Sequence, residues 1–228
     1  MTLPRTLVFD LDGTLVDTAP DLIAALNYVL DREGLPPVPL DKARNMIGAG
    51  ARKLLERGLE VDGRAVSVGD LDRLTKDFID FYADHIADAS RPFEGLEAAL
   101  DQLQGLGFQF AVCTNKLEWL SKRLLDQLGI SARFKAICGA DTFGVAKPDP
   151  VILRQTLAQA GGQLSSAIMV GDAGPDVGVA RRAGIPVIGV EFGYTDVPIA
   201  DLKPDRLIGH FRELAEAVDS LIGAKSQP

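Results

Sequence analysis

Leu7-Val8-Phe9-Asp10-Leu11-Asp12-Gly13-Thr14-Leu15-Val16-Asp17 combines an apolar, strand-like run with three acids. Continuous apolar runs are typical of buried parallel strands, and this one leads directly into Asp10 and Asp12. Ligands of open α/β sheets bind beyond the carboxyl ends of the strands. Residues two apart on a strand point to the same face, so both carboxylates are candidates for one site. We therefore predict a first core strand that ends at a functional site.

The segment after this strand has helical rather than strand-like periodicity. Thr18 is the expected cap of the first helix, and a proline-rich segment, Gly34–Pro39, ends it. Helices are predicted over about 20–33, 41–46, 52–57 and 68–87. We interpret this block as a small helical bundle inserted after the first strand. The alternative is a set of helices that only cover the sheet.

From Arg91 onward, helices and strands alternate. Strands are predicted over 108–114, 134–138, 167–170, 185–190 and 206–208, with helices between them. Such βα units form a parallel sheet with helices on both faces and right-handed crossovers. The predicted fold class is α/β, with a Rossmann-like core and a mainly parallel sheet flanked by helices. The predicted domains are a core, residues 1–16 and 92–228, and a small all-helical cap, residues 17–91.

Composition and charge narrow the possible partners and location. The 228 residues are 46% hydrophobic and 25% charged, and no apolar run approaches the length of a membrane span. The formal net charge of −8 argues against a nucleic-acid partner and against an anionic membrane surface. Cys113 and Cys138 lie in apolar, strand-like runs, where we expect buried reduced thiols and hence a cytoplasmic protein. The oligomeric state is left open.

Polar side chains follow the predicted core strands at their carboxyl ends. They are Asp10, Asp12, Thr114, Asn115, Lys147, Asp172 and Asp176. Any one of them has a structural explanation, such as a helix cap or a solvated loop charge. Their recurrence at successive strand ends instead predicts one shared site.

These residue types suit phosphoryl transfer to or from a small anionic substrate. Clustered carboxylates require a hard cation, and Mg²⁺ binds oxygen ligands of this kind together with phosphate. Lysine, hydroxyl and amide groups donate hydrogen bonds to phosphoryl oxygens, and a carboxylate can itself attack phosphorus. A calcium-binding EF-hand loop is excluded, because Leu15 and Asp21 stand where that loop needs Gly and Glu.

The motifs resemble, in order and spacing, the four motifs of the haloacid-dehalogenase-like hydrolase superfamily. They are Asp10–Asp17, Thr114-Asn115, Lys147–Pro150 and Gly171–Asp176. The match extends over essentially the whole chain, and the inserted helices resemble that superfamily's helical cap of the first type. Many relatives have Ser or Thr at the position of Ala173. Ala173 lacks a hydroxyl, so a hydrogen bond that Ser or Thr would make near the metal is not expected here.

The resemblance implies a role for each motif residue. Asp10 is the expected nucleophile, and Asp12 is the expected general acid/base, which also binds metal through its backbone carbonyl. Thr114 and Asn115 are expected to hold the phosphoryl group, and Lys147 to steady nucleophile and phosphate. The Mg²⁺ site is expected to comprise Asp10, Asp12, Asp172 and Asp176.

The same resemblance points to a substrate class. Asp12 argues against the dehalogenases, which lack an acid there. The stretch Asn45–Leu55, which contains Gly48-Ala49-Gly50, resembles the Gly-x-Gly cap loop of phosphoglycolate phosphatases. Gly50 and Arg52 are therefore predicted to bind substrate, because a helix N-terminus and a basic side chain attract a carboxylate. The alternative is an ordinary turn with solvated basic residues.

The predicted function is that of a Mg²⁺-dependent phosphoric monoester hydrolase acting through an aspartyl-phosphate. The preferred substrate is 2-phosphoglycolate, which would give glycolate and phosphate. Sugar phosphates, nucleotides or pyrophosphate remain alternatives on the same site. From other classes, a signalling phosphoacceptor or a binding protein without turnover remains open.

Overall fold

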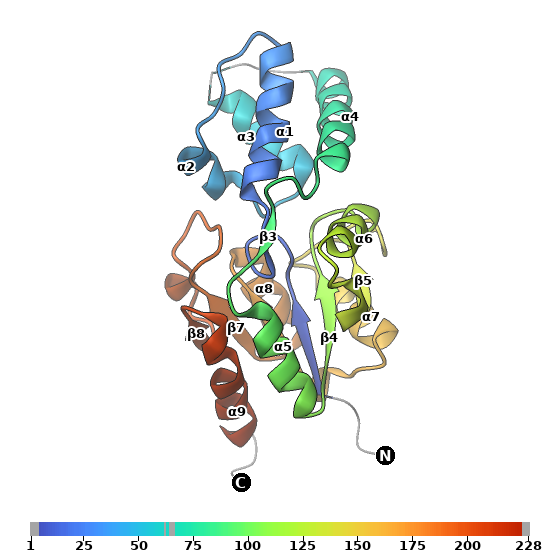
Figure 1. The fold of residues 1–228 in the computed structure, drawn as a ribbon, viewed down its shortest axis with the longest axis vertical. Helices are drawn as coiled ribbons and strands as arrows, with labels where there is room; N and C mark the ends of the chain where they lie inside the picture. The colour runs from blue at the N-terminus through green and yellow to red at the C-terminus, as the bar shows by residue number, and fades with distance from the viewer. Residues whose placement is uncertain (1–4, 62, 64–66, 225–228) are drawn as a thin grey trace.

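The computed structural model describes residues 5–61, 63 and 67–224, and Figure 1 shows a central sheet with helices on both faces. Within this part, a six-stranded sheet has the order β5-β4-β1-β6-β7-β8, and all neighbouring strands are parallel. The strands are β1 (Arg5–Phe9), β4 (Phe108–Cys113), β5 (Phe134–Cys138), β6 (Ala167–Gly171), β7 (Val187–Val190) and β8 (Arg206–Ile208). The predicted Rossmann-like fold class is confirmed.

The side-chain alternation of β1 explains the two helical layers. Leu7 and Phe9 belong to one buried apolar cluster, and Val8 belongs to another. Because successive strand residues point to opposite faces, each face needs its own cover. The covering helices are α5 (Leu96–Gly105), α6 (Glu118–Gln127) and α9 (Leu214–Ala224) for the first cluster, and α7 (Pro150–Gln159) and α8 (Gly174–Ala183) for the second.

A helical bundle lies beyond the carboxyl end of the sheet (Figure 1). It comprises α1 (Ala19–Arg32), α2 (Leu40–Ala43), a 3₁₀ helix (Arg44–Met46), α3 (Ala51–Glu60) and α4 (Val68–Asp84). Helix α1 packs against α3 and α4. The chain enters and leaves the bundle through β2 (Val16–Asp17) and β3 (Arg91–Pro92), which pair antiparallel. The sequence pattern did not predict this short pair.

Some boundaries and one cap differ from the predictions. Thr18 does not cap α1, because its φ of −98° and ψ of −5° are helical and its side chain makes no capping hydrogen bond. Its hydroxyl donates instead to Asp12. The predicted strand over 185–190 begins at Val187, since the Ile185 N–H still closes the end of α8 by donating to the Ala180 carbonyl. The predicted helix over 41–46 is a short α-helix followed by a 3₁₀ turn.

Both cysteines are buried and free, as expected. Among the described residues, no helix has the length and apolar character needed to cross a membrane. The predicted domain ranges also include residues 1–4, 62, 64–66 and 225–228, which lie outside the described residues.

Candidate active site

The strand register brings the predicted site residues to one edge of the sheet. Phe9, at the end of β1, lies beside Val112 of β4 and Val170 of β6. The residues that follow these three strands therefore emerge next to one another. They are Asp10 and Asp12 after β1, Thr114 and Asn115 after β4, and Asp172 after β6, with Asp176 in the first turn of α8.

Asp10, Asp172 and Asp176 form a buried carboxylate cluster. Each offers an oxygen, and these oxygens lie within 4.8 Å of one another. Lys147 joins the cluster, with its Nζ 2.8 Å from Asp10 and 2.7 Å from Asp176. Three carboxylates thus face one buried ammonium group, and the local charge remains negative when all are ionised.

Burial and the surplus of negative charge shift the pKa values of these groups. Burial raises the pKa of Asp10 to about 6, although the charge of Lys147 opposes the rise. Burial, followed by the charges of Asp176 and Asp10, also raises the pKa of Asp172. Burial alone would lower the pKa of Lys147, but Asp10 and Asp176 hold it above its usual range. A cation among the carboxylates would relieve their repulsion.

The donor set fits Mg²⁺. Carboxylate oxygens are the hard ligands that this ion prefers, and Mg²⁺ commonly uses a few of them together with substrate phosphate. Asp10, Asp172 and Asp176 are the residues whose side chains could hold it. The carboxylate of Asp12 does not belong to this cluster.

Backbone and side-chain donors orient the acidic cluster. Thr14 Oγ1 donates to one oxygen of Asp172 at 2.8 Å, and the Tyr194 N–H donates to the other at 2.7 Å. The Ala173 N–H donates to Asp176 at 3.1 Å. A backbone group therefore orients Asp176, whatever side chain follows Asp172. Sequence reasoning assigned no role to Thr14 or Tyr194; Thr14 lies within the first motif, whereas nothing around Tyr194 marked it.

Gly13 is required where the chain turns past Asp172. Its φ is +82°, and a Cβ at this position would lie 2.5 Å from Asp172 Oδ2. A side chain would therefore be strained and would also displace a cluster carboxylate. The glycine of the first motif thus permits the strand end and the acidic cluster to approach closely.

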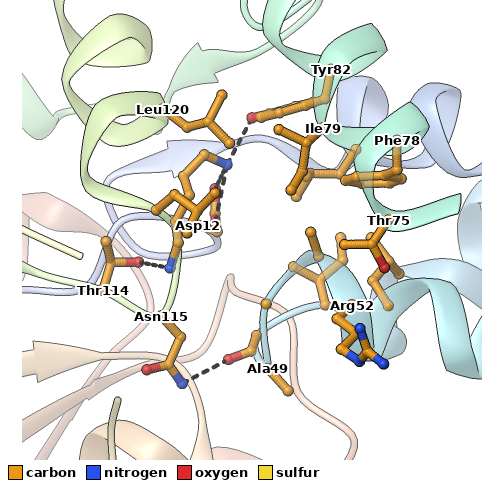
Figure 2. A pocket seen from close by; sticks show the side chains of 18 of the residues that line it. Asp12, Ala49, Arg52, Thr75, Phe78, Ile79, Tyr82, Thr114, Asn115 and Leu120 are labelled. Atoms are coloured by element: carbon orange, nitrogen blue, oxygen red, sulfur yellow. Dashed lines mark hydrogen bonds and ion pairs between the residues drawn. The ribbon is translucent and has the colours of Figure 1, made fainter. Parts of the chain in front are cut away.

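The carboxylate of Asp12 has surroundings of its own (Figure 2). Thr18 Oγ1 donates to Asp12 Oδ1 at 2.8 Å. Lys116 Nζ lies 3.0 Å from Oδ1 and 3.3 Å from Oδ2, and it also donates to the Tyr82 hydroxyl at 2.8 Å. Sequence reasoning missed Lys116 and Tyr82, although Lys116 directly follows the second motif.

Thr114 and Asn115 lie at the site, and both already have partners within the protein. Thr114 Oγ1 accepts a hydrogen bond from the Lys116 N–H. Asn115 accepts from the Lys147 N–H at 2.8 Å and donates to the carbonyls of Lys147 and Gly48. Asn115 therefore holds the Lys147 loop and contacts the loop before α3. Binding of phosphoryl oxygens by these two residues stays a prediction.

A cavity of about 220 Å³ lies between the strand ends and the helical bundle. Its polar floor includes Asp10, Asp12 and Lys116, and its bundle side is largely apolar, with Phe78 and Ile79 among the lining residues (Figure 2). The predicted binding residues Gly50 and Arg52 also line it.

Arg52 is engaged within the bundle. Its guanidinium forms ion pairs with Asp72 and, at 3.7 Å, with Glu56. Gly50 directly precedes α3 with a φ of +88°. The structure thus places both residues at the cavity, with the charge of Arg52 already partnered.

Acids gathered at the strand ends of a Rossmann-like sheet, next to a cavity beneath a helical bundle, are the arrangement expected of an α/β enzyme's active site. Residues 7–190 match the haloacid dehalogenase-like hydrolase family, and the chain belongs to this family.

Relatives resemble the chain over nearly its whole length. It is 45% identical to a phosphoglycolate phosphatase of Caulobacter vibrioides, covering 98% of this chain and 94% of that protein. It is 43% identical to a phosphoglycolate phosphatase of Mesorhizobium japonicum, covering 96% of each. Among solved structures, a predicted phosphoglycolate phosphatase of Haemophilus somnus superposes with a TM-score of 0.87 at 28% identity, covering 95% of this chain and 98% of that one.

Proposed function

We propose that this protein is a Mg²⁺-dependent phosphatase that hydrolyses a small phosphorylated metabolite, with 2-phosphoglycolate as the preferred substrate. The observation that carries the proposal is the buried contact of Lys147 with Asp10 and Asp176 beside Asp172. Positioned charges of this kind are most of what phosphoryl transfer needs. The relatives of highest identity quoted above, which bear the name phosphoglycolate phosphatase, support the substrate.

The proposed reaction has two steps. In the first, a carboxylate oxygen of Asp10 bonds to phosphorus, and the bond from phosphorus to the leaving oxygen breaks. Asp12 donates its proton to that oxygen, so glycolate leaves as an alcohol. In the second, Asp12 takes a proton from water, the water oxygen bonds to phosphorus, and the aspartyl-phosphate bond breaks. Phosphate leaves, and both carboxyl groups return to their starting states.

Contacts with neighbouring residues support these roles. Lys147 and the Leu11 N–H both bind Oδ1 of Asp10, which fixes the orientation of its carboxylate. Thr114 and Asn115 complete the proposed phosphoryl-binding group. Asp10, Asp172 and Asp176, with the backbone carbonyl of Asp12, would hold Mg²⁺. When bound, this ion supplies positive charge that neutralises the carboxylates and the phosphoryl oxygens.

We further propose that residues 17–91 act as a cap over a core of residues 1–16 and 92–228. The placement of the bundle over the strand ends and its connection through the β2–β3 pair support this division. The mostly apolar wall and modest volume of the cavity favour a small leaving group. The free, buried cysteines support a cytoplasmic location, and the net charge of −8 supports the lack of a nucleic-acid partner.

The test is steady-state kinetics with Mg²⁺ on a panel of 2-phosphoglycolate, sugar phosphates, nucleotides and pyrophosphate. We expect the highest kcat/KM for 2-phosphoglycolate. Asp10→Asn should lower kcat by roughly 10⁴-fold or more, as loss of a nucleophile does. Asp31→Asn, which changes an exposed acid on α1, is the matched control. Near-normal turnover by Asp10→Asn, or phosphorylation of the protein without phosphate release, would contradict the proposal.

A further inference from the structure

Lys116 is a buried cation that contacts Asp12 of the strand end and Tyr82 of the helical bundle. Its side chain is 5% exposed and lines the cavity. We propose that Lys116 is a positioning residue for Asp12 and that Tyr82 of α4 links this function to the placement of the bundle. The inference rests on the proposed function, in which Asp12 is the general acid.

The burial of Lys116 makes its position dependent on its partners. Removing an ammonium group from water is unfavourable unless the group is paired and hydrogen-bonded. The structure shows Nζ in contact with both carboxylate oxygens of Asp12 and with the Tyr82 hydroxyl. Nζ also lies 4.3 Å from the centroid of the Tyr82 ring, within the range of a cation–π contact. Asp12 at the strand end and Tyr82 in the bundle thus both fix the position of Lys116.

Tyr82 is suited to this linking role. It is 1% exposed and lies near the end of α4, where its ring stacks on Phe78. Burial, with the charges of Asp12 and Asp21, raises the pKa of Tyr82 well above its usual value, so the hydroxyl stays neutral. The rigid ring of Tyr82 therefore holds a neutral acceptor oxygen at a fixed position, where it binds Lys116.

The hydrogen-bond donors to Asp12 and the donors to Asp10 come from different parts of the molecule. Asp12 accepts from Thr18, which directly precedes α1, and from Lys116, which is tied to α4. Asp10 accepts from Lys147 and from the Leu11 N–H, both in the sheet part of the molecule. The orientation of the acid therefore depends on the bundle, whereas that of the nucleophile depends on the core.

This difference predicts a dependence on the leaving group. An alkoxide such as that of glycolate needs a proton as it departs, whereas the acetate of acetyl phosphate does not. Misorienting a general acid should therefore slow the first substrate and spare the second. The two substrates are similar in size, so a general disturbance of the site would affect both.

The decisive measurement is kcat/KM of the Mg²⁺-loaded enzyme for both substrates, because this ratio reports the steps up to departure of the leaving group. Lys116→Met should lower kcat/KM for 2-phosphoglycolate by about 100-fold, within the usual range for general acid catalysis, and for acetyl phosphate by less than about 3-fold. Tyr82→Phe, which keeps the ring, should show the same pattern at about 5- to 10-fold. Lys122→Met, on an exposed lysine of α6, the helix that begins two residues after Lys116, is the matched control and should change neither value.

Asp12→Asn separates this inference from the function on which it rests. Equal losses on both substrates in Asp12→Asn would contradict the general-acid role itself. Selective loss in Asp12→Asn, with equal or no losses in Lys116→Met and Tyr82→Phe, would overturn the positioning role alone. The double variant Asp12→Asn/Lys116→Met should be no slower than Asp12→Asn, since a positioning residue has no effect without the group it positions. If Lys116→Met does not fold, Tyr82→Phe provides the same contrast.

Discussion

Asp10 and Asp12 are separated by one residue in the chain, yet their carboxylates have different surroundings. Asp10 lies in a buried cluster with Asp172, Asp176 and Lys147. Asp12 is 14% exposed at its side chain and contacts donors linked to the bundle. Two equal groups with unequal environments can take different chemical roles. A nucleophile and an acid/base can thus share the end of one strand.

The raised pKa of Asp10 predicts how the stability of the metal-free protein depends on pH. The native pKa of about 6 exceeds the ordinary value of 3.8, so between these values the native state binds more protons than the unfolded state. The free energy of unfolding should therefore fall as pH rises from about 4 to 7, with Asp10 contributing about 3 kcal/mol. Denaturant unfolding of metal-free protein at several pH values measures this.

Asp10→Asn is the control for that measurement, because asparagine does not titrate. The pH dependence of the variant should be weaker than that of the original protein by the contribution of Asp10. If the cluster binds Mg²⁺ as proposed, this ion should raise the melting temperature more at pH 7.5 than at pH 5, since ionised carboxylates attract a cation more strongly than protonated ones. Equal pH profiles for the two proteins would show that Asp10 has an ordinary pKa.

At the scale of elements, the packing of α1 on α3 depends on a glycine. A Cβ on Gly58 of α3 would lie 2.6 Å from Leu26 Cδ1 of α1. Leu26 is fully buried, so it has little room to move. Gly58→Ala should therefore lower the free energy of unfolding by about 1–2 kcal/mol, despite the better helix propensity of alanine.

Gly69→Ala in α4 is the matched control for this prediction. Among the described residues, no heavy atom lies within 4 Å of the Cβ that it would add, apart from the chain neighbours and the backbone of α4 itself. Here only helix propensity changes, and stability should rise by about 0.5–1 kcal/mol. Urea unfolding of both variants measures the contrast. A stabilised Gly58→Ala protein would show that the α1–α3 contact can relax.

Elements with strong periodicity could be predicted from the sequence, and weakly patterned ones could not. Phe134–Cys138 and Arg206–Ile208 form strands with the predicted bounds, because apolar runs between turn residues have few alternatives. The β2–β3 pair joins Val16–Asp17 to Arg91–Pro92, and two-residue strands carry no periodic signal. Thr18 has the residue type of a helix cap, but tertiary contact with Asp12 determines what its hydroxyl binds.

For the whole molecule, Tyr194 connects the bundle to the acidic cluster. Its hydroxyl donates to Asp17 and accepts from the Ala19 N–H at 3.1 Å, at the start of α1. Its backbone N–H donates to Asp172. Arg44 of the bundle pairs with Asp17 at 3.1 Å and lies over the Tyr194 ring. These contacts join the two parts of the molecule at the point where the chain enters the bundle.

Tyr194→Phe should weaken the contact between the bundle and the core at the start of α1. The buried Ala19 N–H would lose its acceptor, at a cost of about 1–3 kcal/mol in the free energy of unfolding. Amide hydrogen exchange should accelerate at the start of α1, while α9 should keep its relative protection. Tyr28→Phe, whose hydroxyl contacts the exposed Arg32, is the control. Unchanged exchange at Ala19 in Tyr194→Phe would contradict the assigned role of this hydroxyl.

The sequence alone determined the α/β class, the strand ends that carry Asp10, Thr114 and Asp172, and the presence of an inserted helical block. These features depend on periodicity and on residues adjacent in the chain, which a sequence displays directly. Only the tertiary structure decided that Lys116 meets Asp12 and Tyr82, and that Tyr194 meets Asp17. Such contacts join residues far apart in the chain, and their partners depend on how the helices pack over the sheet.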